Sequence, residues 1–256
     1  MAFTIAVAGK GGVGKTTVAG LLVRYLVEKG LTPVLAVDAD SNSNLNDVMG
    51  LPLDSTLGDA REEMKKGQSQ GMTKDLFIGM RVNQCLVESQ GYDLIAMGRP
   101  EGAGCYCAAN HLLTDCMDKL AENYKYLVVD NEAGMEHISR VTTQRVDYLL
   151  VISDPSRRGL NAARRVAELA EQMKILTGPA KLILSMVRGE PDPILAEVAQ
   201  DFGLELAGYI PDDPELASYD LKGAPTSELP ANNPALTAAF AIFDELLAKE
   251  VAENKG

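Results

Sequence analysis

The sequence predicts a single α/β domain, residues 1–256, in which one doubly wound, mostly parallel sheet of about seven strands is flanked by helices. Short apolar runs alternate with longer amphipathic segments along the whole chain, which is the order expected of parallel strands joined by crossover helices. The sequence contains no internal repeat and no Pro/Ser-rich linker. A chain of 256 residues can bury one large core.

The strands are predicted from apolar runs of four to seven residues. Because both faces of such runs are apolar, we expect helices to cover both sides of the sheet. The predicted strands are Phe3–Ala8, Val34–Val37, Tyr92–Met97, Tyr126–Val129, Tyr148–Ser153, Lys181–Val187 and Leu204–Ile210.

The helices are predicted where apolar residues recur at spacings of three and four, which gives each helix one buried face. The region 51–87 is less regular, contains several glycines and many polar residues, and stays unassigned as an insertion or a partner surface. The predicted helices are Thr16–Lys29, His111–Asn123, Arg157–Leu176, Ile194–Phe202 and Pro234–Val251.

Composition argues against nucleic-acid and membrane partners. The net charge of −12 opposes broad attraction to nucleic-acid phosphates or anionic lipids, although a local basic patch stays possible. No stretch approaches the roughly 20 apolar residues that cross a bilayer. The amino terminus resembles a buried strand and not a signal sequence, so we expect a cytoplasmic protein whose four cysteines are reduced.

A phosphate-binding motif follows the first predicted strand and opens the first helix. It satisfies the pattern GxxxxGK[ST] in the strand-to-helix context that the pattern requires. Its glycines let backbone amides wrap around phosphate oxygens at the positive end of the helix dipole. Lys15 can reach the β- and γ-phosphates, and the Thr16 hydroxyl can join the oxygen shell of magnesium. The nucleotide-binding residues predicted here are Gly9, Lys10, Gly11, Gly12, Val13, Gly14, Lys15, Thr16 and Thr17.

The segment GKGGVGKTT resembles the deviant Walker A loop of the MinD, ParA and nitrogenase iron-protein class of ATPases. The resemblance implies Mg-ATP hydrolysis to ADP and a nucleotide-dependent homodimer. In that class the lysine at the position of Lys10 crosses the dimer interface to the phosphates of the other subunit, which gives Lys10 a catalytic role. The alternative is a solvated loop lysine.

Two strand ends carry aspartates at the edge where an open sheet meets its ligand crevice. The run VLAVDADSNSNL is similar to the first switch of the class, which implies that Asp38 supports magnesium and that Asp40 positions or activates the attacking water. Turn or helix capping by Asp40 is the alternative. The run VVDNEAGMEH resembles the second switch, with Asp130 as the Walker B aspartate and Gly134 as a sensor of the γ-phosphate. Glu132 stands where the common form has proline.

Adenine contacts are predicted from the resemblance alone. The class often uses an asparagine near the sixth strand and a Pro-x-Asp segment after the last one. Pro211 and Asp213 fit the second feature, whereas Ser185 and Arg188 fit the first poorly.

Cys105 and Cys107 form a CxC pair beyond the third predicted strand. Side chains two residues apart do not share a helix face, so converging thiolates need a loop or the very start of a helix. Two thiolates are half of a four-coordinate site, which a two-fold dimer would complete. An incidental pair of small apolar residues is the other reading, and it is the one that we adopt for Cys85 and Cys116.

The segments RPEGAGCYC and VVDNEAGMEH resemble the CooC-type ATPases, which insert nickel into carbon monoxide dehydrogenase and related acetyl-CoA synthase enzymes. The resemblance covers essentially the whole chain. It implies that Cys105 and Cys107 bind nickel or zinc between two subunits and that the client is carbon monoxide dehydrogenase or acetyl-CoA synthase. Thiolate ligation suits both ions, so the sequence does not choose between them.

Two rival functions stay open. An iron-sulfur electron-transfer ATPase takes a second cysteine from just after the second switch, and residues 130–145 contain none. A MinD- or ParA-like positioning ATPase uses a basic membrane helix or a basic DNA-binding surface. The carboxyl terminus is acidic, and we interpret the arginines of 157–165 as a solvated helix face. His111, Met135 and His137 could supplement a metal site, but local packing is the favoured interpretation for the last two.

Overall fold

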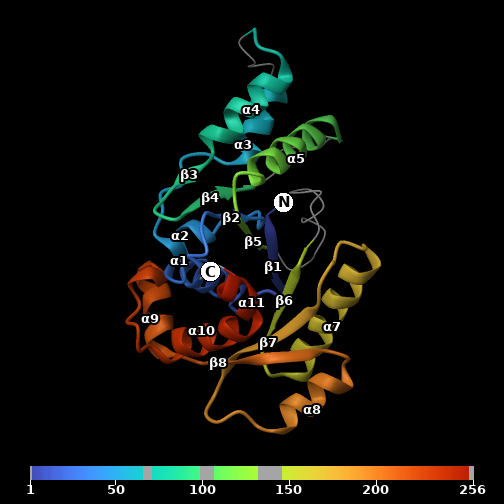
Figure 1. The fold of residues 1–256 in the computed structure, drawn as a ribbon, viewed down its shortest axis with the longest axis vertical. Helices are drawn as coiled ribbons and strands as arrows, with labels where there is room; N and C mark the ends of the chain where they lie inside the picture. Colours follow the sequence, from blue (N-terminus) through green and yellow to red (C-terminus); the bar gives the residue numbers. More distant parts are fainter. Residues whose placement is uncertain (1, 66–70, 99–106, 132–145, 254–256) are drawn as a thin grey trace.

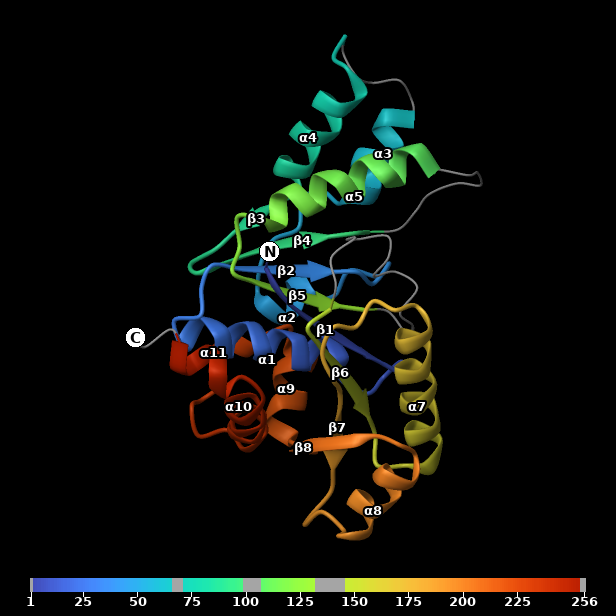
Figure 2. The same cartoon turned by 45° about the vertical axis from the view of Figure 1, so that its right-hand side comes forward.

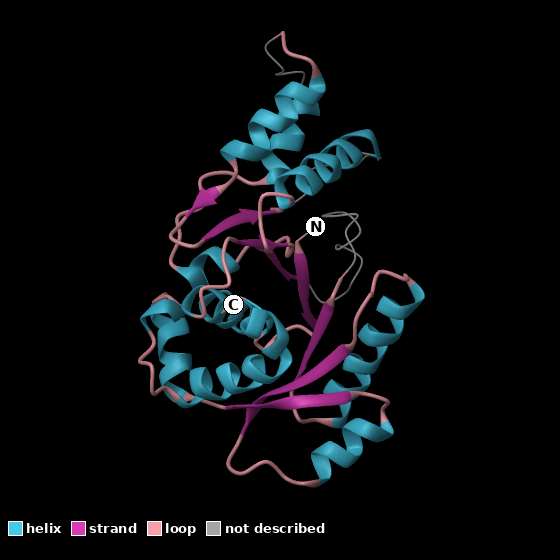
Figure 3. Ribbon diagram, in the orientation of Figure 1, coloured by secondary structure: helices cyan, strands magenta, loops and turns pink. Residues whose placement is uncertain are grey.

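The structure is a computed structural model that describes residues 2–65, 71–98, 107–131 and 146–253. Its centre is an eight-stranded sheet with the order β3-β4-β2-β5-β1-β6-β7-β8 (Figures 1 and 3). All neighbouring strands are parallel except β3 and β4, which are antiparallel. The strands are β1 Phe3–Gly9, β2 Val34–Asp38, β3 Val87–Glu88, β4 Tyr92–Ala96, β5 Tyr126–Asp130, β6 Tyr148–Ser153, β7 Ala180–Val187 and β8 Glu205–Pro211.

Helices cover both faces of this sheet (Figure 2). Helices α1 and α10 pack on one face, α7 and α8 pack on the other, and α3, α4 and α5 form a helical lobe over β2, β4 and β5. The helices are α1 Lys15–Glu28, α2 Leu45–Met49, α3 Leu57–Lys65, α4 Lys74–Gln84, α5 Cys107–Ala121, α7 Arg157–Gln172, α8 Ile194–Asp201, α9 Pro214–Lys222, η1 Thr226–Glu228, α10 Pro234–Leu246 and α11 Ala248–Glu253.

The strand β2 shows how the two faces are filled. Successive side chains of a strand point to opposite faces. Val34 and Ala36 therefore join the core beneath α1, while Leu35 and Val37 join the core beneath the helical lobe. All four are fully buried. The continuous apolar run in the sequence is thus explained by helices on both sides.

All seven predicted strands are present, and the predicted α/β class is confirmed. The eighth strand, β3, begins at the end of the unassigned region, whose described residues also include α3 and α4. The predicted helix Arg157–Leu176 ends earlier, at Gln172, and Lys174 has a left-handed φ of 55° that ends the helical path. The predicted last helix is divided into α10 and α11 near Leu247. Helices α2 and α9 were not predicted.

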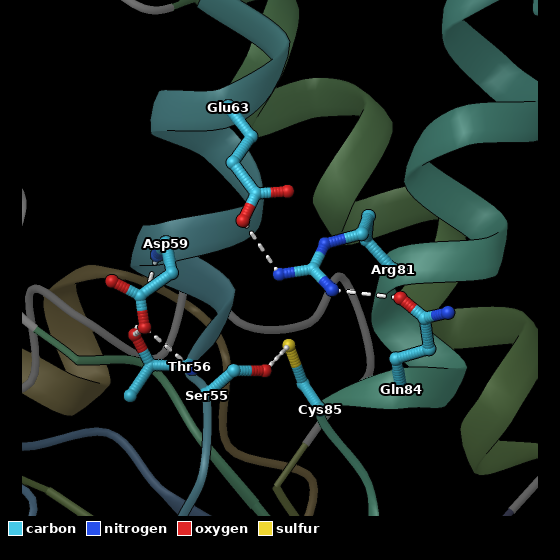
Figure 4. A network of polar contacts seen from close by, with 7 residues as sticks. All are labelled: Ser55, Thr56, Asp59, Glu63, Arg81, Gln84 and Cys85. Atoms are coloured by element: carbon cyan, nitrogen blue, oxygen red, sulfur yellow. Dashed lines mark hydrogen bonds and ion pairs between the residues drawn. The ribbon is translucent and has the colours of Figure 1, made fainter. Parts of the chain in front are cut away.

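Polar contacts hold the helical lobe together (Figure 4). The Arg81 guanidinium on α4 donates to Glu63 Oε1 on α3 at 2.8 Å and to Gln84 Oε1 at 2.7 Å. The Cys85 Sγ lies 3.2 Å from Ser55 Oγ, and burial raises the pKa of the Cys85 thiol. These contacts tie the two ends of the region 51–87 to each other.

The centre of the sheet places the phosphate-binding motif. Strand β1 pairs with β5 on one side and with β6 on the other, so the strand order reverses there. Ligands of open α/β sheets bind at the carboxyl ends of the strands where the order reverses. The loop that follows Gly9 emerges at this point.

Within the described part of the chain, no helix has the length and apolar character needed to cross a membrane.

Candidate nucleotide-binding site

The phosphate-binding loop requires glycine at both of its ends. Gly9 closes β1 with φ 150°, and a Cβ atom there would clash with the carbonyl oxygen of Ile152 on β6. Gly14 precedes α1 with a left-handed φ of 82°, a conformation that glycine adopts without strain. It carries no side chain that could cap the helix, and the first turn contains no acidic residue. The first amides of α1 thus have no side-chain cap and are suited to bind an anion.

Lys15 and Thr16 begin α1 next to this loop. Lys15 is only 8% exposed, and its Nζ donates to the carbonyl oxygen of Lys10 at 3.2 Å. The Lys15 ammonium is thus held against the loop by the backbone of Lys10. The Lys10 side chain itself is exposed, as are Gly11 and Gly12.

Asp38 and Asp130 lie side by side at the ends of β2 and β5. They are register partners and are 0% and 1% exposed. Asp38 accepts hydrogen bonds from the amides of Asp40 at 3.0 Å and Leu45 at 2.9 Å. Burial nevertheless raises the pKa of Asp38 to about 6. The carboxylate also holds the start of α2 through Leu45.

The pKa of Asp130 is raised further than that of Asp38. Burial, with a smaller effect of Asp38, raises the pKa of Asp130 to about 7, although a hydrogen bond from Thr16 and the charge of Lys15 oppose this shift. Its Oδ1 atom is buried without a hydrogen-bond partner among the described residues. A buried, unpartnered carboxylate oxygen is costly, so this position is suited to a ligand.

These residues fit a magnesium ion. Magnesium prefers hard oxygen ligands and keeps several waters. Thr16, Asp38 and Asp130 supply a hydroxyl and two carboxylates at one place, and Asp130 has an oxygen to spare. A nearby cation would also favour the ionised form of both aspartates and lower their raised pKa values.

Asp40 lies at the edge of the same site and is half-buried. Its Oδ1 accepts the amide of Asn42 at 2.8 Å. This contact corresponds to the turn-capping alternative, so the catalytic role of Asp40 stays a prediction. The two readings are compatible because the contact uses one of the two carboxylate oxygens.

The two residues predicted to contact adenine, Pro211 and Asp213, lie at the end of β8 and directly before α9. Pro211 ends β8. Asp213 is 8% exposed and caps α9, since its Oδ1 accepts the amide of Leu216 at 2.8 Å and Asn233 Nδ2 at 3.2 Å. Its carboxylate is therefore engaged in the structure of α9, and a nucleotide contact by Asp213 stays a prediction.

A cavity of about 610 Å³ opens beside the first turn of α1. Thr16 and Thr17 form one wall, and residues of α2 and α9 form the others. The volume lies in the range of small-molecule pockets. Pro211 and Asp213 do not line it. Both α2 and α9, which create this cavity, were missed by the sequence analysis.

Comparison with known proteins decides the family. The profile of the family described as CobQ/CobB/MinD/ParA nucleotide binding domain matches residues 4–226. The chain belongs to this family.

Individual relatives of the CobQ/CobB/MinD/ParA family cover nearly the whole chain. An ATP-binding protein of Methanocaldococcus jannaschii is 42% identical over 96% of this chain and 99% of its own. The carbon monoxide dehydrogenase accessory protein CooC of Rhodospirillum rubrum is 31% identical over 86% of this chain and 90% of its own. The MinD structure from Pyrococcus horikoshii, in complex with Mg-ADP, superposes with a TM-score of 0.72 over 98% of this chain and 99% of its own, at 21% identity, and supports the fold.

Membership of this family makes the protein a P-loop ATPase that uses ATP and magnesium. The structure brings Lys15, Thr16, Asp38 and Asp130 together, as the sequence predicted. It leaves Glu132, Gly134, Met135 and His137 outside the described residues.

The predicted metal-binding cysteines lie at the border of the described residues. Cys105 is outside them, and Cys107 is the first residue of α5, with its side chain outside them as well. The described residues contain no group of three or more His, Cys, Asp or Glu side chains arranged to hold a metal ion. Cys85 is buried and Cys116 half-buried, which agrees with the packing role predicted for them.

The arginine-rich helix predicted to be solvated is α7. Arg157, Arg158, Arg164 and Arg165 are all exposed. Arg164 lies 3.4 Å from Glu168 one turn further along the helix.

Two residues make supporting contacts near the phosphate-binding loop that the sequence analysis did not predict. Ser185 donates from Oγ to the carbonyl of Val13 at 2.6 Å, which fastens β7 to the phosphate-binding loop. Asn131 is fully buried and donates from Nδ2 to the carbonyls of Val7 at 3.0 Å and Val129 at 3.2 Å. A polar residue within or directly after an otherwise apolar strand was the available signal in both cases.

Proposed function

We propose that this ATPase is a metallochaperone, acting as a single-domain cytoplasmic protein, that binds nickel or zinc through Cys105 and Cys107 and assists nickel insertion into carbon monoxide dehydrogenase or acetyl-CoA synthase. The observation that carries the proposal is the 31% identity to a carbon monoxide dehydrogenase accessory protein over 86% of this chain. The CxC pair supplies the thiolates that such a cargo requires.

ATP binding and hydrolysis provide the switch. In this proposal the loop amides and Lys15 hold the phosphates, Thr16, Asp38 and Asp130 hold magnesium, and Asp40 orients the attacking water. The metal ion would neutralise charge that develops on the phosphate oxygens. Asp38 connects this chemistry to the rest of the fold, because its Oδ2 accepts the amide of Leu45 at the start of α2. A change at the phosphates can therefore move α2.

The cargo site requires a homodimer. Two thiolates are half of a four-coordinate site, and a two-fold axis between subunits would supply the other half. Cys107 begins α5, whose first turn contains no acidic residue. The backbone of Cys107 therefore lies at the start of a helix, which is one of the two positions that a converging CxC pair requires.

The decisive test is native mass spectrometry under anaerobic conditions, with and without nickel or zinc. Wild type is expected to form a dimer with one ion per two chains, and the Cys105→Ser, Cys107→Ser double variant to lose the ion. Cys116→Ser, in the same helix α5, is the matched control and should keep it. Absence of bound metal in wild type would overturn the metallochaperone proposal and favour a positioning ATPase.

Lys10 tests the dimer separately from the metal. Its carbonyl oxygen accepts the hydrogen bond from Lys15, whereas its side chain is exposed. If Lys10 reaches the phosphates of the partner subunit, Lys10→Ala should abolish hydrolysis and spare ATP binding. Retained turnover in Lys10→Ala would show that hydrolysis does not need a lysine from a second copy of the chain.

A further inference from the structure

Met186, near the end of β7, has an unusual backbone and an unusual exposure. Its φ is 56°, in the left-handed region that residues with a side chain rarely adopt. It is 46% exposed, although Leu182, Ile183, Leu184 and Val187 of the same strand are buried. Strained residues of this kind persist where the surrounding structure enforces them, and they cluster at ligand sites.

A β-bulge between β7 and β8 produces this conformation. Leu184 pairs with Tyr209 and Val187 pairs with Pro211, so two residues of β7 stand opposite one of β8. Bulges of this type redirect a side chain. Ser185 is fixed by its hydrogen bonds to the carbonyls of Val13 at 2.6 Å and Ser153 at 3.3 Å. The bulge therefore turns Met186 out of the sheet while the preceding residue stays attached to the phosphate-binding loop.

The redirected side chain lies against this loop. A Cβ atom built on Gly14 would lie 3.9 Å from the Cε atom of Met186. Gly14 immediately precedes α1, where the phosphates of ATP bind. A salt bridge between Arg188 and Asp212, with Nε to Oδ2 at 2.9 Å, joins the carboxyl ends of β7 and β8 just beyond Met186. An exposed apolar group thus lies beside the phosphate-binding loop, at the carboxyl end of β7.

We propose that Met186 is the side chain on which the nucleobase of bound ATP packs. Sulfur-aromatic contacts are favourable, and the flexible thioether adapts to a flat ring. The contact supplies packing and no hydrogen bond, so it contributes similarly to adenine and guanine. This assignment goes beyond the metallochaperone proposal and does not depend on it, because it concerns only the nucleotide.

The test compares a ligand that has a base with one that lacks it. Isothermal titration calorimetry with Mg-ADP and with Mg-tripolyphosphate would be applied to wild type, Met186→Ala, Met186→Gly and Met186→Leu. We expect ADP affinity to fall about tenfold in the Ala and Gly variants, while tripolyphosphate affinity is unchanged and Leu stays within about threefold of wild type. Ile194→Ala, which truncates a 53% exposed residue at the start of α8, should change neither affinity.

The Gly variant separates binding from folding. Glycine adopts a left-handed φ without strain, so the melting temperature of Met186→Gly should not fall even as ADP affinity does. In steady state, Met186→Ala should raise KM for ATP and for GTP by a similar factor and leave kcat unchanged, since the packing is equal in the ground and transition states.

Two results would overturn the assignment. Unchanged ADP affinity in both the Ala and Gly variants would show that no base packs on Met186. Equal losses for ADP and tripolyphosphate, or a fall in kcat at constant KM, would show that Met186 only shapes the phosphate-binding loop. Both results are independent of whether the protein binds nickel or zinc.

Discussion

The phosphate-binding region and the helical lobe differ in how their charged side chains are paired. Beside the phosphate-binding loop, Asp38 and Asp130 are buried next to each other, and one Asp130 oxygen has no hydrogen-bond partner among the described residues. In the helical lobe, the two terminal nitrogens of Arg81 donate to Glu63 and Gln84 (Figure 4), and its buried Nε has no hydrogen-bond partner among the described residues. The first arrangement places two like charges side by side, whereas the second forms an ion pair of opposite charges within the protein.

This difference shows which region is shaped for chemistry and which for architecture. A buried carboxylate with a raised pKa destabilises the ligand-free protein and gains a partner when a cation binds. An ion pair with hydrogen bonds mainly fixes the position of two helices. Changes in the first region should therefore affect activity most, and changes in the second should affect stability with little effect on activity.

The largest effect is expected from Lys15→Ala. The variant removes the buried ammonium that lies against the phosphate-binding loop, and we expect kcat to fall by at least about 10³-fold. Phosphate release at saturating ATP measures this. Lys29→Ala is the control, because Lys29 follows the other end of α1 and pairs with Asp244. Turnover above a tenth of wild type in Lys15→Ala would contradict the assigned role.

Asp130→Asn should abolish hydrolysis and yet stabilise the metal-free protein. The pKa of Asp130 is raised from 3.8 to about 7, so the native state binds a proton that the unfolded state has lost between these values. The penalty of the charged form therefore grows as pH rises from about 4 to 7 and is fully present above 7. We expect Asn to raise the unfolding free energy at pH 8 by roughly 2–4 kcal/mol, and to have little effect at pH 4.

Urea denaturation in a chelating buffer at both pH values measures this change. Asp54→Asn, at an exposed position before α3, is the matched control and should be neutral at both. An equal effect of Asp130→Asn at pH 4 and pH 8 would show that the charge of Asp130 does not oppose folding.

Arg81→Ala should lower stability and leave ATP hydrolysis nearly unchanged, which is the opposite of the effect expected for Asp130→Asn. The variant leaves Glu63 without the guanidinium that lies 2.8 Å away, and we expect the unfolding free energy to fall by about 1–3 kcal/mol. The ATPase rate of the folded protein should stay within twofold of wild type. Arg157→Ala, an exposed arginine of α7, should change neither quantity. A large loss of kcat in Arg81→Ala would mean that the helical lobe takes part in hydrolysis.

The smallest effect is expected from Ser185→Ala, because Ser185 only supports the phosphate-binding loop from the strand β7. It removes the hydrogen bond from β7 to the carbonyl of Val13, so stability should fall by about 1 kcal/mol. KM for ATP should rise roughly two- to fivefold because the loop is less firmly held. The exposed Ser227→Ala is the control. An unchanged KM would show that the loop keeps its shape without β7.

The sequence analysis succeeded for the strands and failed for the helical lobe for identifiable reasons. The strands are covered on both faces, and their continuous apolar runs identify them without knowledge of their neighbours. The helices α3 and α4 are short, and much of their stability comes from packing on α5 and from contacts such as Arg81 to Glu63, which are 18 residues apart. The strand β3 has two residues and gives no periodic signal.

The phosphate-binding motif was predictable because its function depends on local backbone geometry. Its glycines, Lys15 and Thr16 lie within one strand-loop-helix segment, so their spacing alone fixes their relative positions. The same holds for the aspartates at the strand ends, since parallel strands bring their carboxyl ends to one edge. The sequence thus determined the fold class and the ATPase family resemblance, and it predicted the residues that line the phosphate site.

Only the tertiary structure decided how these residues are charged and supported. The raised pKa values of Asp38 and Asp130 arise from burial between neighbouring strands, and burial depends on the packing of distant segments. Three further features depend on the folded structure in the same way. They are the helix cap that Asp213 forms, the hydrogen bond from Ser185 to Val13, and the bulge that redirects Met186. Spacing along the chain specifies local geometry, whereas desolvation and long-range hydrogen bonds exist only in the folded protein.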